Sequence, residues 1–180
     1  RLRNLVDNML GPNKVPDQKP TNIHEVLERA RQLIEVESSG NVRIIRDYDP
    51  SIPDITGDRE QLIQAVLNIM RNALQALNQS PPEHETPSIT LRTRTLRQFT
   101  IGSHRHRLVC RVDIIDNGPG IPPDIAQSIF LPMISGRADG SGLGLSISQS
   151  ILNHHQGLIE CRSEPGRTEF SLFIPVEHEQ

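Results

Sequence analysis

The residues of this chain with the clearest chemical potential are one aspartate and two glycine-rich segments. Asp116 begins the run Asp-Asn-Gly-Pro-Gly-Ile at 116–121, and Gly-Ser-Gly-Leu-Gly follows at 140–144. A carboxylate at a strand end can accept a hydrogen bond from an exocyclic amine, while glycines let backbone N–H groups approach anionic oxygens. The second run leads into an apolar helical pattern at 145–152, so its amides would lie at a helix N-terminus, where phosphate binds well.

Either glycine run alone has an ordinary explanation as a turn or loop. A third segment upstream favours the chemical interpretation. Asn68 and Asn72 are four residues apart in an apolar helical pattern over 58–78, so both carboxamides project from one face. Amide oxygens suit Mg²⁺, which takes few protein ligands and completes its shell with water and phosphate. Mid-helix asparagines that only face water are the alternative.

The order of these segments resembles the ATP-binding domain of sensor histidine kinases. The asparagine helix is similar to the N box of that family, 116–121 to its G1 box, 130–133 to its F box and 140–145 to its G2 box. The closing segment 166–175 resembles the terminal strands of the family. Within the family, the sequence at 46–50, 71–77 and 132–137 is similar to that of the nitrogen-regulation kinases, and this resemblance covers nearly the whole chain.

The resemblance implies ATP and Mg²⁺ as cofactors and a role for each matching position. Asn72 would be the metal ligand, Asp116 would accept the adenine amine with the help of Thr168, Phe130 would anchor the ATP lid, and Arg137 in the lid would contact phosphate. The implied ATP-binding residues are Asn68, Asn72, Asp116, Gly118, Gly120, Ile121, Phe130, Arg137, Gly140, Gly142, Leu143, Gly144 and Thr168.

Two positions depart from the family pattern. Many relatives have a lysine three residues after the metal-binding asparagine and an aromatic residue next to it, where this chain has Gln75 and Ala76. A phosphate contact and a base-stacking contact are therefore missing there. Arg71 or Arg137 would have to supply the positive charge.

Asn68 bears on the type of reaction. In the related gyrase and MutL ATPases the residue one turn before the metal-binding asparagine is a glutamate that activates water, whereas an amide cannot take that proton. The resemblance thus implies transfer of the γ-phosphate to another nucleophile, which relies on orientation and charge neutralisation. An independent ATPase of the gyrase or MutL type is the disfavoured alternative. A nucleotide-responsive interaction module is a further alternative.

None of the seven histidines has the setting of the family's phosphoacceptor, so we expect no autophosphorylation by this chain alone. No paired His/Cys spacing of the zinc type occurs either. We expect solvated side chains at His24, His84, His104, His106, His154 and His155.

The resemblance implies three parts and several partners. Residues 1–12 would be the C-terminal end of a dimerisation and phosphoacceptor helix, 13–20 a linker, and 21–180 the ATP-binding catalytic domain. The implied partners are the dimerisation and phosphoacceptor domain of the same kinase, a response regulator of the NtrC type and a PII-like signal protein.

Composition indicates a cytoplasmic location and argues against membrane-spanning and nucleic-acid-binding functions. The 180 residues are 35% hydrophobic and 23% charged, with two cysteines that form no disulfide framework. No apolar run is long enough for a membrane span. The net charge of −3 and the aromatic content of 3% disfavour nucleic-acid binding. Residues 88–112 contain arginines and no acid, which predicts a basic hairpin with one buried face and one largely solvated face.

The pattern predicts an α+β fold. Asn22 with Glu25, and Asp58 with Gln61, have the spacing of helix capping boxes. The family resemblance specifies a two-layer α/β sandwich of the Bergerat type, with a mixed sheet, helices on one face and a flexible ATP lid. We expect helices at 22–37, 58–78, 123–129 and 142–155, and strands at 42–48, 88–99, 107–115, 158–162 and 168–175.

Overall fold

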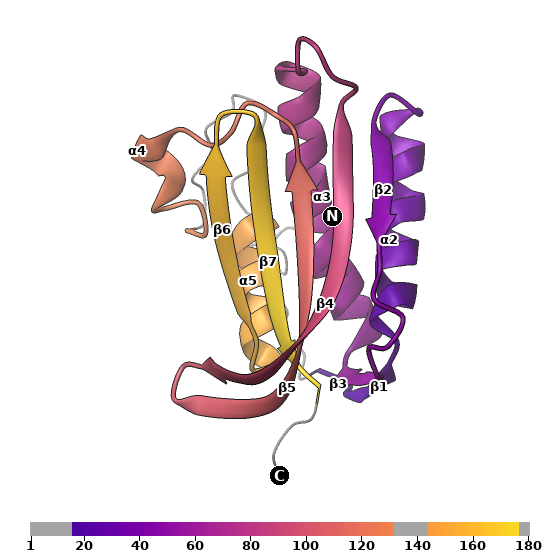
Figure 1. Cartoon of the computed structure of the whole chain (residues 1–180), viewed down its shortest axis with the longest axis vertical. Coiled ribbons are helices and arrows are strands. Elements are labelled where there is room, and N and C mark those ends of the chain that lie inside the picture. The colour runs from indigo at the N-terminus through magenta and orange to yellow at the C-terminus, as the bar shows by residue number, and fades with distance from the viewer. Residues whose placement is uncertain (1–15, 132–143, 177–180) are drawn as a thin grey trace, which may run out of the picture.

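Three helices lie against one face of a five-stranded sheet (Figure 1). The computed structural model describes residues 16–131 and 144–176. The apolar residues of the helices and of the inner sheet face form one core. A short fourth helix lies beside the edge of the sheet, away from the other three. The helices are α2 (Ile23–Ser38), α3 (Arg59–Gln79), α4 (Pro123–Ala126) and α5 (Gly144–His154).

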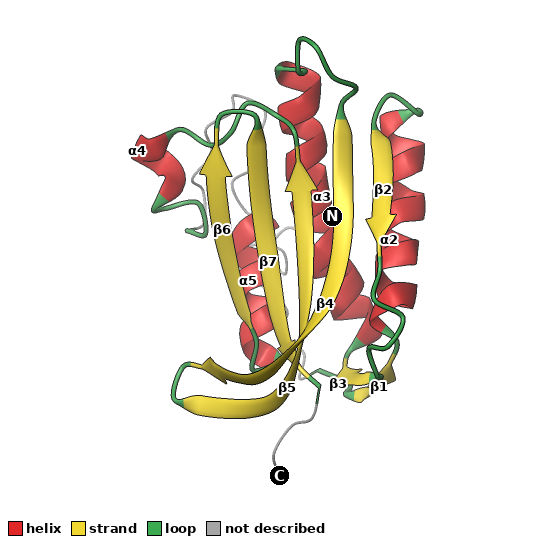
Figure 2. Cartoon of the chain, in the orientation of Figure 1, coloured by secondary structure: helices red, strands yellow, loops and turns green. Residues whose placement is uncertain are grey.

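The sheet is mixed, as predicted (Figure 2). One edge strand runs parallel to its neighbour, and the other three pairings are antiparallel. The helices of the described residues cover one of its faces, so the expected two-layer α+β architecture is confirmed. The strands, in spatial order, are β2 (Arg43–Asp47), β4 (Ser88–Ile101), β5 (His104–Asp116), β7 (Arg167–Pro175) and β6 (Leu158–Glu164).

The two long helices begin where their capping residues predict. The Asn22 side chain accepts a hydrogen bond of 2.9 Å from the backbone N–H of His24, and the Asp58 side chain accepts one of 3.2 Å from the N–H of Gln61. Each bond satisfies a donor that the first helical turn leaves without an intrahelical partner. Both helices then bury an apolar stripe against the sheet.

A small second sheet was not predicted. Strand β1 (Lys19–Thr21) pairs antiparallel with β3 (Ile55–Gly57). The first two residues of β1 belong to the segment expected to be a linker. Just before them, the N–H of Asp17 donates a 2.9 Å hydrogen bond to Asp58. The chain that enters the fold is therefore fixed beside the start of α3.

The β4–β5 hairpin bends across the end of the helix-free sheet face (Figure 1). Gln98 has a positive φ of 52° and interrupts the pairing between the two strands. Beyond this point Phe99 stacks on Phe173 of β7, with ring centroids 4.9 Å apart and planes 4° from parallel. The guanidinium of Arg111 lies over the same Phe173 ring and makes a cation–π contact with it.

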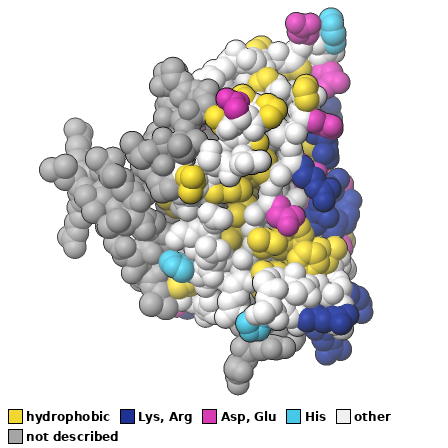
Figure 3. Space-filling view, turned by 90° about the vertical axis from the view of Figure 1, so that its left-hand side faces the viewer, with side chains coloured by type: hydrophobic (Ala, Val, Ile, Leu, Met, Phe, Trp, Pro, Cys, Tyr) yellow, Lys and Arg dark blue, Asp and Glu magenta, His cyan; other side chains and the backbone are white. Residues whose placement is uncertain are grey.

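The helix-free face is not largely solvated, contrary to the prediction for the hairpin. Val109 is fully buried and Asp113 is 1% exposed. Asp113 remains charged there because Arg92 and Arg111 each donate to it, at 2.9 and 2.8 Å, and Ser171 adds a hydrogen bond of 2.6 Å. Basic side chains gather along the edge of the molecule formed by this face (Figure 3).

Histidines also differ from the expectation of solvated side chains. His155 is fully buried and His106 is 7% exposed, while His24 bonds to the Thr93 hydroxyl at 2.8 Å. His154 and His84 are exposed, as predicted. Within the described residues, no helix is both long and apolar enough to cross a membrane.

Candidate functional site

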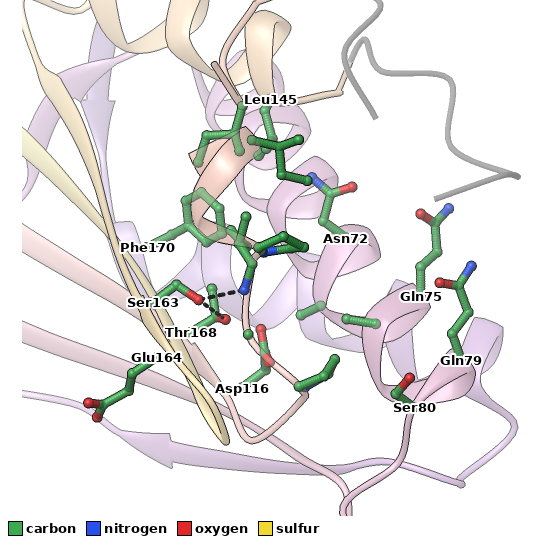
Figure 4. Close-up of a pocket in the computed structure, with 18 of the residues that line it drawn as sticks. Asn72, Gln75, Gln79, Ser80, Asp116, Leu145, Ser163, Glu164, Thr168 and Phe170 are labelled. Atoms are coloured by element: carbon green, nitrogen blue, oxygen red, sulfur yellow. Dashed lines mark hydrogen bonds between the residues drawn. The ribbon is translucent and has the colours of Figure 1, made fainter. Parts of the chain in front are cut away.

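A cavity of about 690 Å³ lies between α3, the loop after β5, the beginning of α5 and the β6–β7 hairpin (Figure 4). This volume lies in the range of roughly 300–1,000 Å³ that is usual for small-molecule sites. Predicted residues from four separate segments line the cavity: Asn68, Asn72, Asp116, Gly120, Ile121, Gly144 and Thr168.

Three polar residues form a row across neighbouring strands at one end of the cavity. Asp116 of β5 is opposite Thr168 of β7, and Thr168 is opposite Ser163 of β6. Directly paired residues point to the same face, so this row continues the inner apolar face of the sheet with polar groups. Asp116 and Thr168 are 5% and 4% exposed. Such buried polar atoms are suited to recognising a polar ligand group.

Ser163 connects the row to the loop after β5. Its Oγ accepts a 2.7 Å hydrogen bond from the backbone N–H of Ile121 and lies 2.9 Å from Oγ1 of Thr168 (Figure 4). A hydroxyl has one donor and two acceptor sites, so Ser163 can accept from Ile121 and still either donate to or accept from the Thr168 hydroxyl. The chain of bonds holds the loop, β6 and β7 in one arrangement.

The loop after β5 needs its glycines for close packing around Asp116. The N–H of Gly118 donates a 2.9 Å hydrogen bond to Oδ1 of Asp116, which orients the carboxylate. Gly120 has a φ of +88°, and a Cβ there would lie 2.7 Å from the carbonyl oxygen of Glu164. A larger residue at 120 would push the loop away from the β6–β7 hairpin.

Helix α3 presents its two predicted asparagines to the cavity. Asn72 points into it (Figure 4), and Nδ2 of Asn68 donates to the Gly144 carbonyl oxygen at 3.4 Å. Asn68 therefore also contacts the first turn of α5. The residues present fit Mg²⁺ held mainly by phosphate and water, with one protein amide as a ligand. The described ranges contain no cluster of three His, Cys, Asp or Glu residues that could hold a metal by themselves.

Apolar side chains form the remaining walls and would pack against a flat ring. Phe130 does not line the cavity itself. Its ring packs edge-on against Phe170, which does, with centroids 6.2 Å apart and planes at 87°. Ala76 lines the cavity at the position where an aromatic residue was expected from the family pattern. The apolar lining residues include Ala73, Ala76, Ile125, Ile129, Leu145 and Phe170.

Cys161 lies two residues before Ser163 on β6, next to the Asp116–Thr168–Ser163 row. Burial raises the pKa of its thiol to about 12, and the nearby Asp116 carboxylate adds to this effect. The group therefore stays a thiol at neutral pH and is a poor nucleophile. Its contribution to the site is packing.

Several predicted residues lie outside the cavity or outside the description. Gly118 adjoins the cavity through Asp116, and Phe130 supports it from behind. Arg137, Gly140, Gly142 and Leu143 lie outside the described residues. Prediction missed Ser163 and Phe170, although their places opposite Thr168 and Cys161 on paired strands follow from the β6–β7 hairpin register.

Comparison with known proteins supplies the family. Residues 57–178 match the family described as histidine kinase-, DNA gyrase B-, and HSP90-like ATPase. The chain belongs to this ATPase family. The family description indicates that ATP is the nucleotide for a domain of this kind.

Within the ATPase family the chain is similar to sensory histidine kinases. It is 51% identical over 176 residues to the sensory histidine kinase/phosphatase NtrB of Salmonella typhimurium, a match that covers 98% of this chain and 49% of NtrB. The chain thus spans about half the length of the curated relatives it matches. The predicted resemblance to nitrogen-regulation kinases is confirmed.

Solved structures of histidine kinases share the fold. Full-length ShkA in complex with AMPPNP has a TM-score of 0.75 and 22% identity, covering 99% of this chain and 36% of ShkA. ThkA in complex with the response regulator protein TrrA has a TM-score of 0.74 and 23% identity, covering 98% of this chain and 48% of ThkA. The predicted two-layer histidine kinase fold is therefore confirmed.

Proposed function

We propose that residues 21–180 are the ATP-binding catalytic domain of an NtrB-like sensor histidine kinase. In this proposal residues 1–12 are the C-terminal end of a dimerisation and phosphoacceptor helix and 13–20 the linker; residues 1–15 lie outside the described residues. The observation that carries the proposal is the arrangement around one cavity of the Asp116–Thr168–Ser163 row, in which Asp116 and Thr168 are buried, and an asparagine-bearing helix face. One end suits a base with an exocyclic amine, and the other suits phosphate and a metal.

Asp116 is the residue that selects adenine in this proposal. Its carboxylate accepts a hydrogen bond from the exocyclic amine, while the N–H of Gly118 keeps the carboxylate oriented. The hydrogen-bonded hydroxyls of Thr168 and Ser163 offer further polar contacts to the base beside Asp116. Phe170 and the neighbouring aliphatic side chains exclude water from the faces of the ring.

Asn72 provides an amide oxygen for Mg²⁺ at the opposite end of the cavity, and Asn68 lies one turn earlier on the same helix face. Bound Mg²⁺–ATP supplies a γ-phosphoryl group that can be transferred. Neither asparagine has a titratable group that could take a proton from water. The α3 face therefore orients the nucleotide and disfavours hydrolysis, so that transfer to an external nucleophile is the favoured reaction.

The nucleophile in this proposal is a histidine of the dimerisation and phosphoacceptor domain of the same kinase, acting in the cytoplasm. A response regulator then receives the phosphate. The structural similarity to ThkA, which was solved with the response regulator TrrA, supports a partner of this class. The NtrB resemblance supports an NtrC-like regulator and a PII-like signal protein in particular.

Phosphotransfer between separate pieces tests this function. The 180-residue chain is mixed with radiolabelled ATP, Mg²⁺ and a separately purified dimerisation and phosphoacceptor domain from an NtrB-type kinase. We expect acid-labile label on that domain, no label on the chain alone, and little label with Asp116→Asn. An absence of label when both pieces are folded and bind each other would contradict the proposed function.

A further inference from the structure

Arg71 has a distinctive position at the rim of the cavity. It precedes Asn72 on α3 and lines the cavity together with Asn68 and Gln75, which lie three residues before it and four after it. These spacings place the three side chains along one edge of the helix. Among the described residues that line the cavity, Arg71 is the only lysine or arginine.

A carboxylate outside the cavity holds the Arg71 guanidinium. Nε of Arg71 donates to both oxygens of Glu37 at 3.1 and 3.2 Å, and a terminal nitrogen donates to Oε1 at 2.7 Å. Glu37 belongs to the last turn of α2 and does not line the cavity. One edge of the guanidinium fork is thus committed to a neighbouring helix.

This ion pair is open to competition. The side chains of Arg71 and Glu37 are 48% and 37% exposed, and exposed ion pairs are weak because water screens them. A polyphosphate carries more negative charge than one carboxylate and offers oxygens that match the same fork. A triphosphate in the cavity would therefore compete effectively for Arg71.

We propose that Arg71 is a phosphate-binding cation of the nucleotide site and that Glu37 competes with the phosphates for it. This inference rests on the proposed function and deepens it, because it assigns the phosphate contact that Gln75 cannot make as a cation. Nucleotide binding then transfers the guanidinium from Glu37 to phosphate. The Glu37 carboxylate lowers nucleotide affinity and couples occupancy of the site to the end of α2.

Calorimetric titration of the 180-residue chain with Mg²⁺–ATP and with adenosine tests this assignment, because adenosine has no phosphate. For Arg71→Gln we expect ATP affinity to fall about tenfold and adenosine affinity to stay within about twofold, the loss of one charged hydrogen-bonding group. For Glu37→Gln we expect ATP affinity to rise about threefold to fivefold, because ATP then no longer has to break an exposed ion pair, and such pairs are weak.

Two further variants isolate the competition. In the Arg71→Gln background, Glu37→Gln should leave ATP affinity unchanged. Glu37 acts on ATP binding only by competing for Arg71, and this double-mutant cycle removes the guanidinium for which it competes. Glu35→Gln is the matched control on the same helix, since Glu35 pairs at 2.7 Å with Arg31, which does not line the cavity. We expect it to change neither affinity.

Wild-type ATP affinity in both Arg71→Gln and Glu37→Gln, beside normal adenosine binding, would overturn this inference and leave the proposed function standing. The same holds if Glu37→Gln tightens ATP binding equally with and without Arg71. If the folded wild-type chain binds neither ATP nor adenosine, the proposed function fails and this inference fails with it.

Discussion

Nε2 of His155 accepts a 2.9 Å hydrogen bond from the backbone N–H of Asp58, while Nδ1 lies 2.8 Å from the carbonyl oxygen of Ile151. These two contacts require a proton on Nδ1 and none on Nε2. His155 follows the end of α5, and Asp58 caps the beginning of α3. The imidazole therefore joins α3 and α5, which both line the cavity, at their ends remote from it.

Replacing His155 with phenylalanine should destabilise the fold while keeping the ring volume. The buried N–H of Asp58 and carbonyl of Ile151 lose a partner, so we expect the free energy of unfolding to fall by about 2 kcal/mol. Urea denaturation measures this change. His154→Phe is the control, because His154 is exposed and should cost less than about 0.5 kcal/mol. Equal effects of the two variants would show that the bridge has no energetic role.

Gly120→Ala should disrupt the loop around Asp116. Its Cβ would lie 2.7 Å from the Glu164 carbonyl oxygen, in addition to the strain of a φ of +88°. Gly166→Ala is a closely matched control, since Gly166 also has a φ of +88° but open space around its Cβ position. We expect Gly166→Ala to cost about 1 kcal/mol of stability, and Gly120→Ala to cost more and to weaken ATP binding as well. Thermal unfolding and calorimetry separate the two effects.

Ser163→Ala should weaken ATP binding through the base site. The variant leaves the N–H of Ile121 without its 2.7 Å acceptor and removes the partner of the Thr168 hydroxyl. A lost hydrogen bond of this kind costs about 1 kcal/mol, so we expect a Kd for ATP about fivefold higher. Ser103→Ala in the exposed β4–β5 turn is the control. Unchanged affinity for ATP in Ser163→Ala would exclude the residue from nucleotide recognition.

Asp113 should make the stability of the domain depend on pH on the acid side. Burial alone would raise the pKa of this carboxyl, but hydrogen bonds from Ser171, Arg111 and Arg92 outweigh it and lower the pKa. A folded pKa below the unfolded value of about 3.9 means that the carboxylate stabilises the fold above about pH 4. This contribution is lost as the pH falls through the folded pKa.

Asp113→Asn should therefore unfold at a clearly lower temperature than the wild type at pH 7, and the difference should shrink as the pH falls from 5 to 2. Melting curves monitored by circular dichroism measure it. Asp47→Asn removes a half-exposed carboxylate that pairs with Arg94 and should change stability by less than about 1 kcal/mol. A gap between wild type and Asp113→Asn that stays constant with pH would contradict the charge assignment.

Prediction from sequence worked best where local chemistry determines structure. Asn22 and Asp58 start their helices because each side chain can accept a hydrogen bond from the first turn. Asn68 and Asn72 both line the cavity. Their spacing of four residues places them on one face of α3, and the apolar stripe of the helix packs against the core beside that face. The strands of the sheet, with Asp116 at the end of one, followed from their alternation.

Features that depend on long-range packing were missed. Strands β1 and β3 have three residues each, too short for a periodic signal. The burial of Asp113 results from arginines on two strands and a hairpin that bends at Gln98, and His155 is buried by its contact with Asp58, 97 residues away. The pairing of Arg71 with Glu37 likewise joins two helices through residues that are 34 positions apart in the sequence. Sequence spacing contains no record of such contacts.

Nucleotide selectivity tests the central claim most directly, because it requires the Asp116 carboxylate and the Asn72 amide to act on one ligand. ATP and GTP are titrated calorimetrically into the chain, into Asp116→Asn and into Asn72→Ala, each with and without Mg²⁺. We predict that the wild type binds ATP at least tenfold more tightly than GTP, that Asp116→Asn loses this preference, and that Asn72→Ala loses the response to Mg²⁺. Equal binding of ATP and GTP by the wild type, or selectivity that survives in Asp116→Asn, would contradict the account.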